Sequence, residues 1–276
     1  MVSSVAVIGT GRMGSMLLQA SHRFSPGRFQ LFASGRQSTL DPLKDAIADL
    51  RTGSAGEIAA ACDLIILAVQ PANYLALVAK IAPALKPGAV LVSITNGIPL
   101  EAIAERSRAP LVKAVPNVAH AVGRGISLVM SGPRADTTHV GNVVDFISPF
   151  SKPVVIPARD ARPATNITSC GPALLSLFAT ALVQANAKKT NGVGHDVLLS
   201  LMNETLGATA AMIDAGIGLE QIMRDAATGG GMTQAALEAL SLGLPELADA
   251  AVEQTFARER LLNASSMKPT RQGGDE

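Results

Sequence analysis

Short apolar runs alternate with helix-like segments through the first half of the chain. A strand buried on both faces of a parallel sheet is apolar along its length, whereas a helix repeats its apolar residues every three or four positions. By these patterns, residues 5–8, 29–33, 64–69, 89–94, 111–115 and 126–130 are predicted strands, and residues 13–22, 43–50, 57–61, 73–82 and 100–106 are predicted helices. Such alternation predicts an α/β fold, a Rossmann-type doubly wound parallel sheet.

The pattern changes between Pro157 and Pro163, and no further strand is predicted beyond this point. Four apolar segments of helical length follow, and the first is apolar around much of its circumference: residues 172–188, 196–215, 233–242 and 246–262. A domain of about a hundred residues has little interior for several such helices, so part of their surface is expected in a subunit interface. We therefore predict two domains, 1–160 and 161–276, the second all-helical and ending in a polar, frayed tail over 263–276.

Composition narrows the possible partners. The chain has 276 residues, of which 48% are hydrophobic and 16% charged, so it can bury a sizeable core. A net charge of +1 gives no reason to expect a nucleic-acid or membrane-surface partner. No secretory signal or membrane-spanning apolar run is evident, so a cytoplasmic location is the default expectation. Neither the two cysteines nor the scattered histidines have the spacing of a metal site, and none is predicted.

A glycine-rich pattern follows the first predicted strand and opens the first predicted helix. It consists of Gly9, Thr10, Gly11, Arg12, Met13 and Gly14. Gly9 permits a tight turn, Gly11 lets the backbone approach a pyrophosphate, and Gly14 lets the helix pack close to the strand. The helix N-terminus then offers free N–H groups to the phosphates. In this context the pattern predicts a dinucleotide-binding turn.

The end of the second predicted strand indicates which dinucleotide binds. An acidic residue there would hydrogen-bond the ribose 2′-hydroxyl of NAD, but the chain has Ser34-Gly35-Arg36 and no acid before Asp41. A hydroxyl and a guanidinium suit a 2′-phosphate, so Ser34 and Arg36 favour NADPH over NADH. The other interpretation is that Arg36 is a solvated surface charge.

Four further motifs follow in order along the chain: Ala68-Val69-Gln70-Pro71, Val115-Pro116-Asn117, Ser169-Cys170-Gly171-Pro172-Ala173 and Gly230-Gly231-Met232-Thr233. With the glycine-rich turn, they resemble the motifs of the pyrroline-5-carboxylate reductases, over about residues 5–262. The resemblance implies an NAD(P)H-binding domain and a helical dimerisation domain, assembled as a homodimer or a larger ring of dimers. It also implies reduction of a cyclic imine, 1-pyrroline-5-carboxylate, to L-proline in amino-acid biosynthesis.

The resemblance also implies roles for individual residues. The cofactor contacts it adds are Ala68, Val69 and Gln70 at the nicotinamide ribose, Pro71 beside them, and Pro116 and Asn117 at the nicotinamide. Gly230 and Gly231 would present backbone N–H groups to the substrate carboxylate, and Thr233 would place its hydroxyl near the imine nitrogen as the catalytic group. These residue types suit the chemistry, since hydride transfer belongs to the cofactor and the protein must position the imine.

Several positions depart from the family pattern: Ala55 and Gln70 stand where the family often has Asn and Lys, Cys170 where it has Ser, Gly229 where it has Pro, and Met232 where it has a smaller residue. Losing that proline loosens the carboxylate loop. Two alternatives therefore stay open, a non-catalytic dinucleotide-binding paralogue with a regulatory role and a reductase of a different imine or a carbonyl.

Each substrate motif also has a purely structural interpretation. Residues 229–231 could be a flexible loop, Thr233 a helix N-cap and Asn117 a turn residue. The segment from Ser169 to Pro172 could simply start a helix. The four histidines, His22, His120, His139 and His195, are interpreted as structural or exposed.

Overall fold

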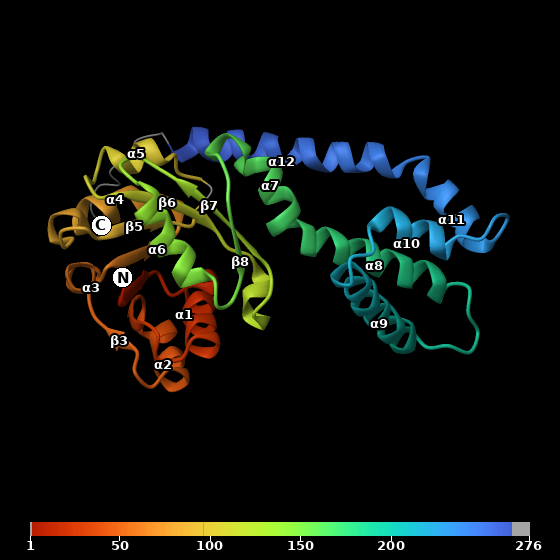
Figure 1. Ribbon diagram of the computed structural model, residues 1–276, viewed down its shortest axis with the longest axis horizontal. Coiled ribbons are helices and arrows are strands. Elements are labelled where there is room, and N and C mark those ends of the chain that lie inside the picture. Colours follow the sequence, from red (N-terminus) through yellow and green to blue (C-terminus); the bar gives the residue numbers. More distant parts are fainter. Residues whose placement is uncertain (1, 96, 267–276) are drawn as a thin grey trace, which may run out of the picture. The chain divides into compact units, whose positions relative to one another are not determined.

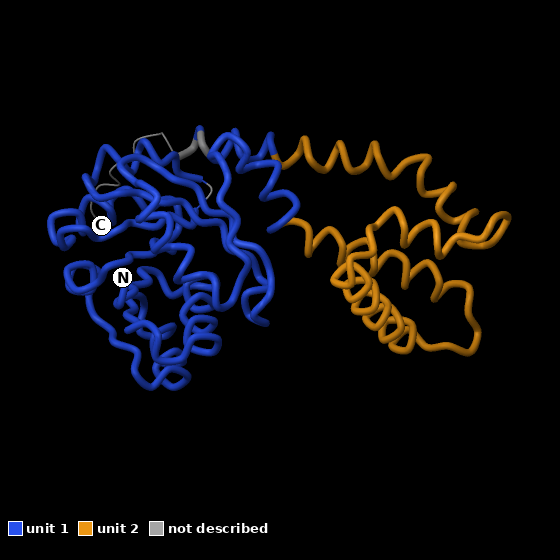
Figure 2. The backbone as a smooth tube through the Cα atoms, viewed as in Figure 1, with its two compact units in different colours: residues 1–169, 256–276 blue, residues 170–255 orange. Residues whose placement is uncertain are grey.

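A computed structural model describes residues 2–95 and 97–266 of the chain, which fall into two compact units. Unit 1 comprises Met1–Ser169 and Phe256–Glu276, and unit 2 comprises Cys170–Thr255 (Figure 2). The chain thus leaves unit 1 at Ser169 and returns to it at Phe256. The functional boundary between residues 160 and 161 stays a prediction.

Unit 1 is built on one eight-stranded sheet (Figure 1). Its strands are β1 Ser4–Ile8, β2 Gln30–Ser34, β3 Arg51–Thr52, β4 Leu64–Leu67, β5 Val90–Ser93, β6 Leu111–Val115, β7 Ile126–Ser131 and β8 Lys152–Val155. They lie in the order β3-β2-β1-β4-β5-β6-β7-β8, and all neighbours are parallel except β6 and β7. The order of the first six strands is that of a Rossmann fold, so the predicted fold class is confirmed.

Helices cover both faces of this sheet because alternate residues of each buried strand point to opposite sides. Val5 and Val7 belong to the core under one set of helices, and Ala6 and Ile8 to the core under another. The first set is α1 Arg12–Phe24, α2 Gln37–Ala46 and α6 Thr137–Ile147; the second is α3 Ala55–Ala61, α4 Pro71–Ile81 and α5 Leu100–Ala104. Connections of this kind place helices on both sides of a parallel sheet.

Sequence patterns missed four strands and α-helices of unit 1: β3, β8, α6 and the short α7 Ala161–Thr165. β3 has only two residues, too few for a periodic signal, and β8 contains Pro153, which is tolerated because β8 is an edge strand. Helix α6 was also missed, although its buried Val140, Val143, Phe146 and Ile147 recur at helical spacing. The parallel sheet predicted throughout also needs one correction, since β7 runs antiparallel to β6.

Helices alone follow β8 in the described chain, as predicted. They are α7 Ala161–Thr165, α8 Gly171–Ala187, α9 His195–Asp214, α10 Leu219–Ala226, α11 Met232–Ser241 and α12 Leu244–Ser266, with a π-helical turn η4 Asn166–Cys170 between α7 and α8. Helix α10 was not predicted. The predicted tail begins inside α12, which continues to Ser266, and its remaining residues, 267–276, lie outside the described residues.

The stretch Ala158–Ala187 is long and apolar enough to span a membrane by length and composition, contrary to the sequence expectation. It passes because α7, η4 and α8 join end to end into one apolar helical run. Core helices of globular proteins pass the same test, so this criterion by itself is weak evidence for a membrane span.

Candidate dinucleotide and substrate site

Four predicted site segments gather at one edge of the unit 1 sheet. Gly9 follows β1, Ser34 ends β2, Ala68 follows β4 and Asn117 lies two residues beyond β6. These strands belong to the parallel part of the sheet, so their carboxyl ends point the same way. The chain order reverses between β1 and β4, and open α/β sheets bind ligands at such a switch point.

The glycine-rich turn is packed tightly on its inner side. Gly9 has φ of +102°, which L side chains rarely adopt, and its N–H donates to the Ser34 carbonyl at 2.8 Å. A Cβ at Gly9 would lie 2.5 Å from the Ala68 oxygen, and one at Gly14 would collide with the Gly9 oxygen. Both positions therefore require glycine because of contacts within the protein itself. Gly9 joins the ends of β2 and β4 to the turn.

Gly11 differs from the other two glycines of the turn. It is exposed, it is the N-cap of α1, and a Cβ placed there would meet nothing within 4 Å. The exposed Arg12 and half-buried Met13 follow it, and the first turn of α1 carries no acidic residue. The open side of the turn thus combines a helix N-terminus with free backbone space, an arrangement suited to a phosphate.

The loop after β2 is fixed by its backbone and leaves a cation exposed. Arg36 is the exposed N-cap residue of α2, and Ser34 is half-buried. The Arg36 carbonyl accepts hydrogen bonds from Thr39 N at 2.9 Å, Leu40 N at 3.1 Å and Thr39 Oγ1 at 2.8 Å. The residue that carries the guanidinium is therefore held in place while its side chain stays accessible.

Thr10 uses its side chain inside the protein. It is buried, and its hydroxyl lies 2.5 Å from the Thr39 hydroxyl. Gly35 faces it so closely that a Cβ there would collide with Thr10 Oγ1. Sequence reasoning singled out Thr10 but missed Thr39, because no motif marks a threonine three residues after a helix cap.

The residues after β4 begin helix α4. Ala68 and Val69 are half-buried, Gln70 is the exposed N-cap residue and Pro71 is the first helical residue. Proline suits this position because its missing N–H would have no helical partner there. Gln70 makes no side-chain capping hydrogen bond, so its amide points to no fixed partner within the helix.

Asn117 is 6% exposed and makes hydrogen bonds through both ends of its amide. Its Oδ1 accepts from Ala119 N at 3.0 Å, which caps the 3₁₀ turn η2 Val118–Val122. Its Nδ2 donates to the Thr168 carbonyl in the π-helical turn η4, at 2.8 Å. Asn117 therefore ties the end of β6 to η4, as a turn residue would, and its cofactor contact stays a prediction.

The predicted substrate residues lie in unit 2, at the start of α11. The Gly231 N–H donates to the Thr228 carbonyl at 2.8 Å, and Gly230 has φ of +73°, which favours glycine. The N-cap of α11 is Gly231, and Thr233 is the second helical residue, with an exposed side chain. The interpretation of Thr233 as an N-cap is therefore wrong. Met232 is 92% exposed.

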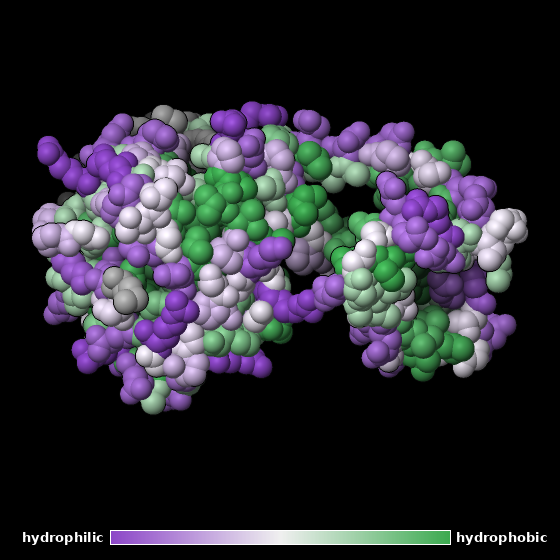
Figure 3. Space-filling view, in the orientation of Figure 1, coloured by the Kyte–Doolittle hydropathy of each residue, from purple (hydrophilic) through white to green (hydrophobic). Residues whose placement is uncertain are grey.

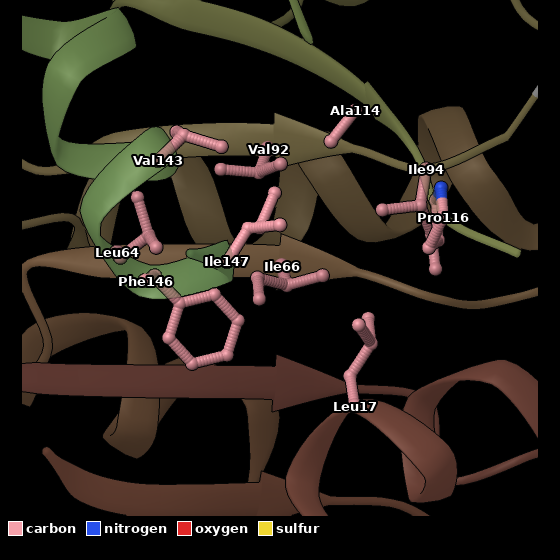
Figure 4. Close-up of a pocket in the computed structure, with 10 residues that line it drawn as sticks. All are labelled: Leu17, Leu64, Ile66, Val92, Ile94, Ala114, Pro116, Val143, Phe146 and Ile147. Carbon is pink, nitrogen blue, oxygen red and sulfur yellow. The ribbon is translucent and has the colours of Figure 1, made fainter. Parts of the chain in front are cut away.

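One apolar pocket of unit 1 has a predicted site residue, Pro116, in its lining. It lies between α1, α6 and the strands that they cover, and apolar side chains line it (Figure 4). Val143 and Phe146 of α6 point into it from one side and Ile66 and Val92 from the sheet. A lining without polar groups offers no means to orient a polar substrate, so this pocket is part of the core.

Two family descriptions match the chain. "NADP oxidoreductase coenzyme F420-dependent" matches residues 4–97, and "pyrroline-5-carboxylate reductase dimerisation" matches residues 159–262. Pyrroline-5-carboxylate reductase 3 of Bacillus subtilis (strain 168) is 22% identical to the chain, and the match covers 98% of this chain and all of that protein. The chain belongs to the pyrroline-5-carboxylate reductase family. It is thus related to NADP-linked oxidoreductases.

Two other proteins are also similar to the chain. ComE operon protein 4 of Bacillus subtilis (strain 168) is 22% identical over 88% of the chain and 90% of its own length. Pyrroline carboxylate reductase of Plasmodium falciparum, solved with NADP bound, has the same fold, with a TM-score of 0.81 and 24% identity over 95% of this chain and 98% of that one.

The two matched regions of this reductase-family chain contain most of the predicted site. The first includes the turn Gly9 to Gly14, the loop with Arg36 and the segment after β4, and the second includes Gly230 to Thr233. Asn117 falls between them. Within residues 2–95 and 97–266, no three His, Cys, Asp or Glu side chains gather as a metal site would require.

Proposed function

We propose that the protein is an NADPH-dependent reductase of a cyclic imine, with 1-pyrroline-5-carboxylate as substrate and L-proline as product. The observation that carries this proposal is the pairing of two features in one chain. One is a dinucleotide turn whose Gly11 is open to a phosphate, and the other is a matched reductase dimerisation domain with an exposed Thr233 at a helix start.

Unit 1 would hold the dinucleotide. Gly11 and the first turn of α1 would present backbone N–H groups to the pyrophosphate, and Arg36 with Ser34 would bind the 2′-phosphate. The Gly9 N–H already donates to the Ser34 carbonyl, so Gly9 would shape the turn. Ala68 and the residues that follow it border the nicotinamide side, since Gly9 packs directly against the Ala68 carbonyl. When bound, the nicotinamide supplies the hydride, and the protein supplies position and orientation.

The start of α11 would hold the substrate. The N–H groups of Gly230 and of the first helical turn would meet a carboxylate. The N–H of Gly231 was expected to do the same, but it already donates to the Thr228 carbonyl at 2.8 Å, so Gly231 would shape the loop. The Thr233 hydroxyl would hydrogen-bond the imine nitrogen. As the carbon accepts hydride, this nitrogen becomes an amine and keeps a proton, which a fixed hydroxyl can stabilise.

Assembly as a homodimer belongs to the same proposal. The matched description names dimerisation, and helices α8 and α9 expose Leu175, Leu177 and Leu201 in the single chain. A second copy would cover such a surface, since permanent interfaces are large and apolar. Dimers would associate into larger assemblies by covering apolar surface in the same way.

NADPH consumption with a small panel of imines tests the proposed reaction. We expect 1-pyrroline-5-carboxylate to be reduced, and plain 1-pyrroline, which lacks the carboxylate, to react at least about 100-fold more slowly in kcat/KM. Reduction of a six-membered imine acid instead would move the function to a different imine. Tight NADPH binding without reduction of any imine would favour the non-catalytic alternative, which the Met232 and Gln70 departures suggest.

Arg36→Ala tests the cofactor. Loss of a charge-assisted contact should weaken NADPH binding by about 1–3 kcal/mol and leave NADH binding nearly unchanged. Lys44→Ala, which removes another exposed cation from the same helix, is the matched control and should alter neither affinity. An equal loss for both cofactors would contradict the NADPH assignment.

A further inference from the structure

We propose that Thr39 is a positioning residue for the 2′-phosphate site, through a chain of hydroxyl groups that joins the glycine-rich turn to the Arg36 carbonyl. The proposal rests on the proposed NADPH preference and assigns a role to a residue outside every motif considered above. Thr39 lies in α2, half-buried, and touches Thr10 on one side and Arg36 on the other.

The direction of the hydrogen bonds follows from counting protons. Each threonine hydroxyl has one proton, and Thr39 Oγ1 donates its own to the Arg36 carbonyl at 2.8 Å. In the 2.5 Å contact between the two hydroxyls, Thr10 must therefore be the donor and Thr39 the acceptor. The result is a directed chain from Thr10 through Thr39 to the Arg36 carbonyl.

This chain links two parts of the proposed cofactor site through side chains, beside the backbone hydrogen bond from Gly9 N to the Ser34 carbonyl. Thr10 lies between Gly9 and Gly11 of the pyrophosphate turn, and Arg36 carries the guanidinium proposed for the 2′-phosphate. Thr10 is 3% exposed, so its hydroxyl is shielded from water and from the open side of the turn. The Thr10 end of the hydroxyl pair therefore resists competition by solvent, and the contact with the half-buried Thr39 fixes the separation of the two loops.

The close fit of Gly35 supports the same role. A Cβ at Gly35 would collide with Thr10 Oγ1, so the residue between Ser34 and Arg36 has to be small for the chain to form. The loop after β2 is therefore shaped around the Thr10 hydroxyl. Positioning of this kind raises affinity by holding Arg36 ready before the ligand arrives.

Thr39→Val tests the proposal, because valine keeps the shape and removes the hydroxyl. We expect the Kd of NADPH to rise about tenfold and the Kd of NADH to change less than about twofold, since only NADPH uses Arg36. Thr39→Ser should restore the wild-type Kd for NADPH. In an Arg36→Ala background, Thr39→Val should weaken NADPH binding no further.

These measurements separate positioning from general damage and from an error in the cofactor. Equal losses for NADPH and NADH, or failure of Thr39→Ser to rescue, would overturn the positioning role. Suppose that the wild type prefers NADPH and that Arg36→Ala abolishes this preference. An unchanged Kd of NADPH in Thr39→Val would then overturn this proposal alone. Equal wild-type affinity for the two cofactors would overturn the NADPH assignment, and this proposal with it.

Discussion

The two units differ in how much of their apolar surface is buried within the single chain. In unit 1 the sheet collects its apolar side chains into two large clusters, one on each face. In residues 170–255, all of which the structure describes, only Ala179 and Val183 are buried. Leu177 and Met223 are typical of the rest, at 68% and 46% exposed, and apolar surface lies over α8 and α9 in Figure 3.

This difference indicates which contacts stabilise each unit. Unit 1 contains its own core, so its folding free energy is a property of one chain. Unit 2 leaves large apolar side chains in water, where each forfeits about 1.5–3 kcal/mol of burial. The matched dimerisation domain indicates that a partner surface covers these side chains, and the proposed homodimer would supply that surface.

The largest expected effect is the loss of assembly in a Leu177→Glu variant. In the single chain this side chain is exposed, so the substitution alone should alter stability by less than about 0.5 kcal/mol. In a homodimer it would bury an unpaired charge, at a cost of several kcal/mol per subunit. We expect light scattering to show monomers at micromolar concentration, where the wild type forms dimers.

Val122→Glu is the matched control for this experiment. Val122 is 66% exposed in unit 1, nearly as exposed as Leu177, so the same change in chemistry is made outside the helical unit. We expect Val122→Glu to remain dimeric. If both variants dissociate, or if the wild type is itself a stable monomer, the proposal that unit 2 forms the subunit interface is wrong.

A second prediction concerns the pH dependence of unit 1. Burial lowers the pKa of His120 to about 4, and the ring is fully buried beside Ser127 and Phe150. The unfolded chain therefore binds a proton below about pH 6.5 that the folded chain refuses until about pH 4. The stability that the neutral ring contributes is fully present above pH 6.5. The free energy of unfolding should decrease by about 3 kcal/mol as the pH falls from 6.5 to 4.

Denaturant titrations at several pH values measure this slope. His120→Gln removes the titrating group, so its stability should vary less over the same range, whatever its stability at neutral pH. His195→Gln, at an exposed histidine of unit 2, should keep the wild-type slope. A wild-type slope that survives in His120→Gln would show that other groups carry the pH dependence.

The fold of unit 1 could be predicted well because its buried strands are apolar along their length and turn residues separate them. The antiparallel direction of β7 could not, because an apolar run looks the same whichever way it pairs. Helix α10 was missed for a different reason. It has eight residues, and its apolar positions, such as Ile222 and Met223, stand among charged neighbours.

The candidate site was predicted where a motif has a local physical cause. Gly9 and Gly14 require glycine because a side chain at either position would collide with a backbone oxygen, so the pattern reports a real constraint. Thr39 acts through a partner 29 positions away, and nothing local in the sequence marks such a pair. The N-cap interpretation of Thr233 failed because capping depends on where α11 begins, which shifts by a residue or two from sequence alone.

Thr233→Val tests whether unit 2 contributes chemistry as well as assembly. Since Thr233 is not the N-cap of α11, its replacement by valine should leave melting nearly unchanged. Loss of a hydrogen bond to the imine nitrogen should lower kcat/KM about 100-fold, while NADPH affinity persists. Thr233→Ser, which keeps a hydroxyl, should retain most activity. Normal turnover by Thr233→Val would remove Thr233 from the proposed mechanism.

The smallest expected effect tests the claim that unit 1 is stable on its own. Ser54 and Glu57 form a capping box at the start of α3, in which Ser54 Oγ accepts from Glu57 N at 3.3 Å and Glu57 Oε2 accepts from Ser54 N at 2.8 Å. Ser54→Ala should lower the stability of unit 1 by about 1 kcal/mol. Ser38→Ala, at an exposed serine in α2, should change it by less than about 0.5 kcal/mol.

The dependence on protein concentration makes this small shift informative. A unit with its own core unfolds with a free energy that does not depend on concentration, whereas a unit stabilised by a partner gains stability as concentration rises. We therefore expect the Ser54→Ala shift to be the same at low and high micromolar protein, and the Leu177→Glu defect to shrink as concentration increases. A Ser54→Ala shift that grows or vanishes with dilution would mean that unit 1, too, depends on the partner chain for its stability.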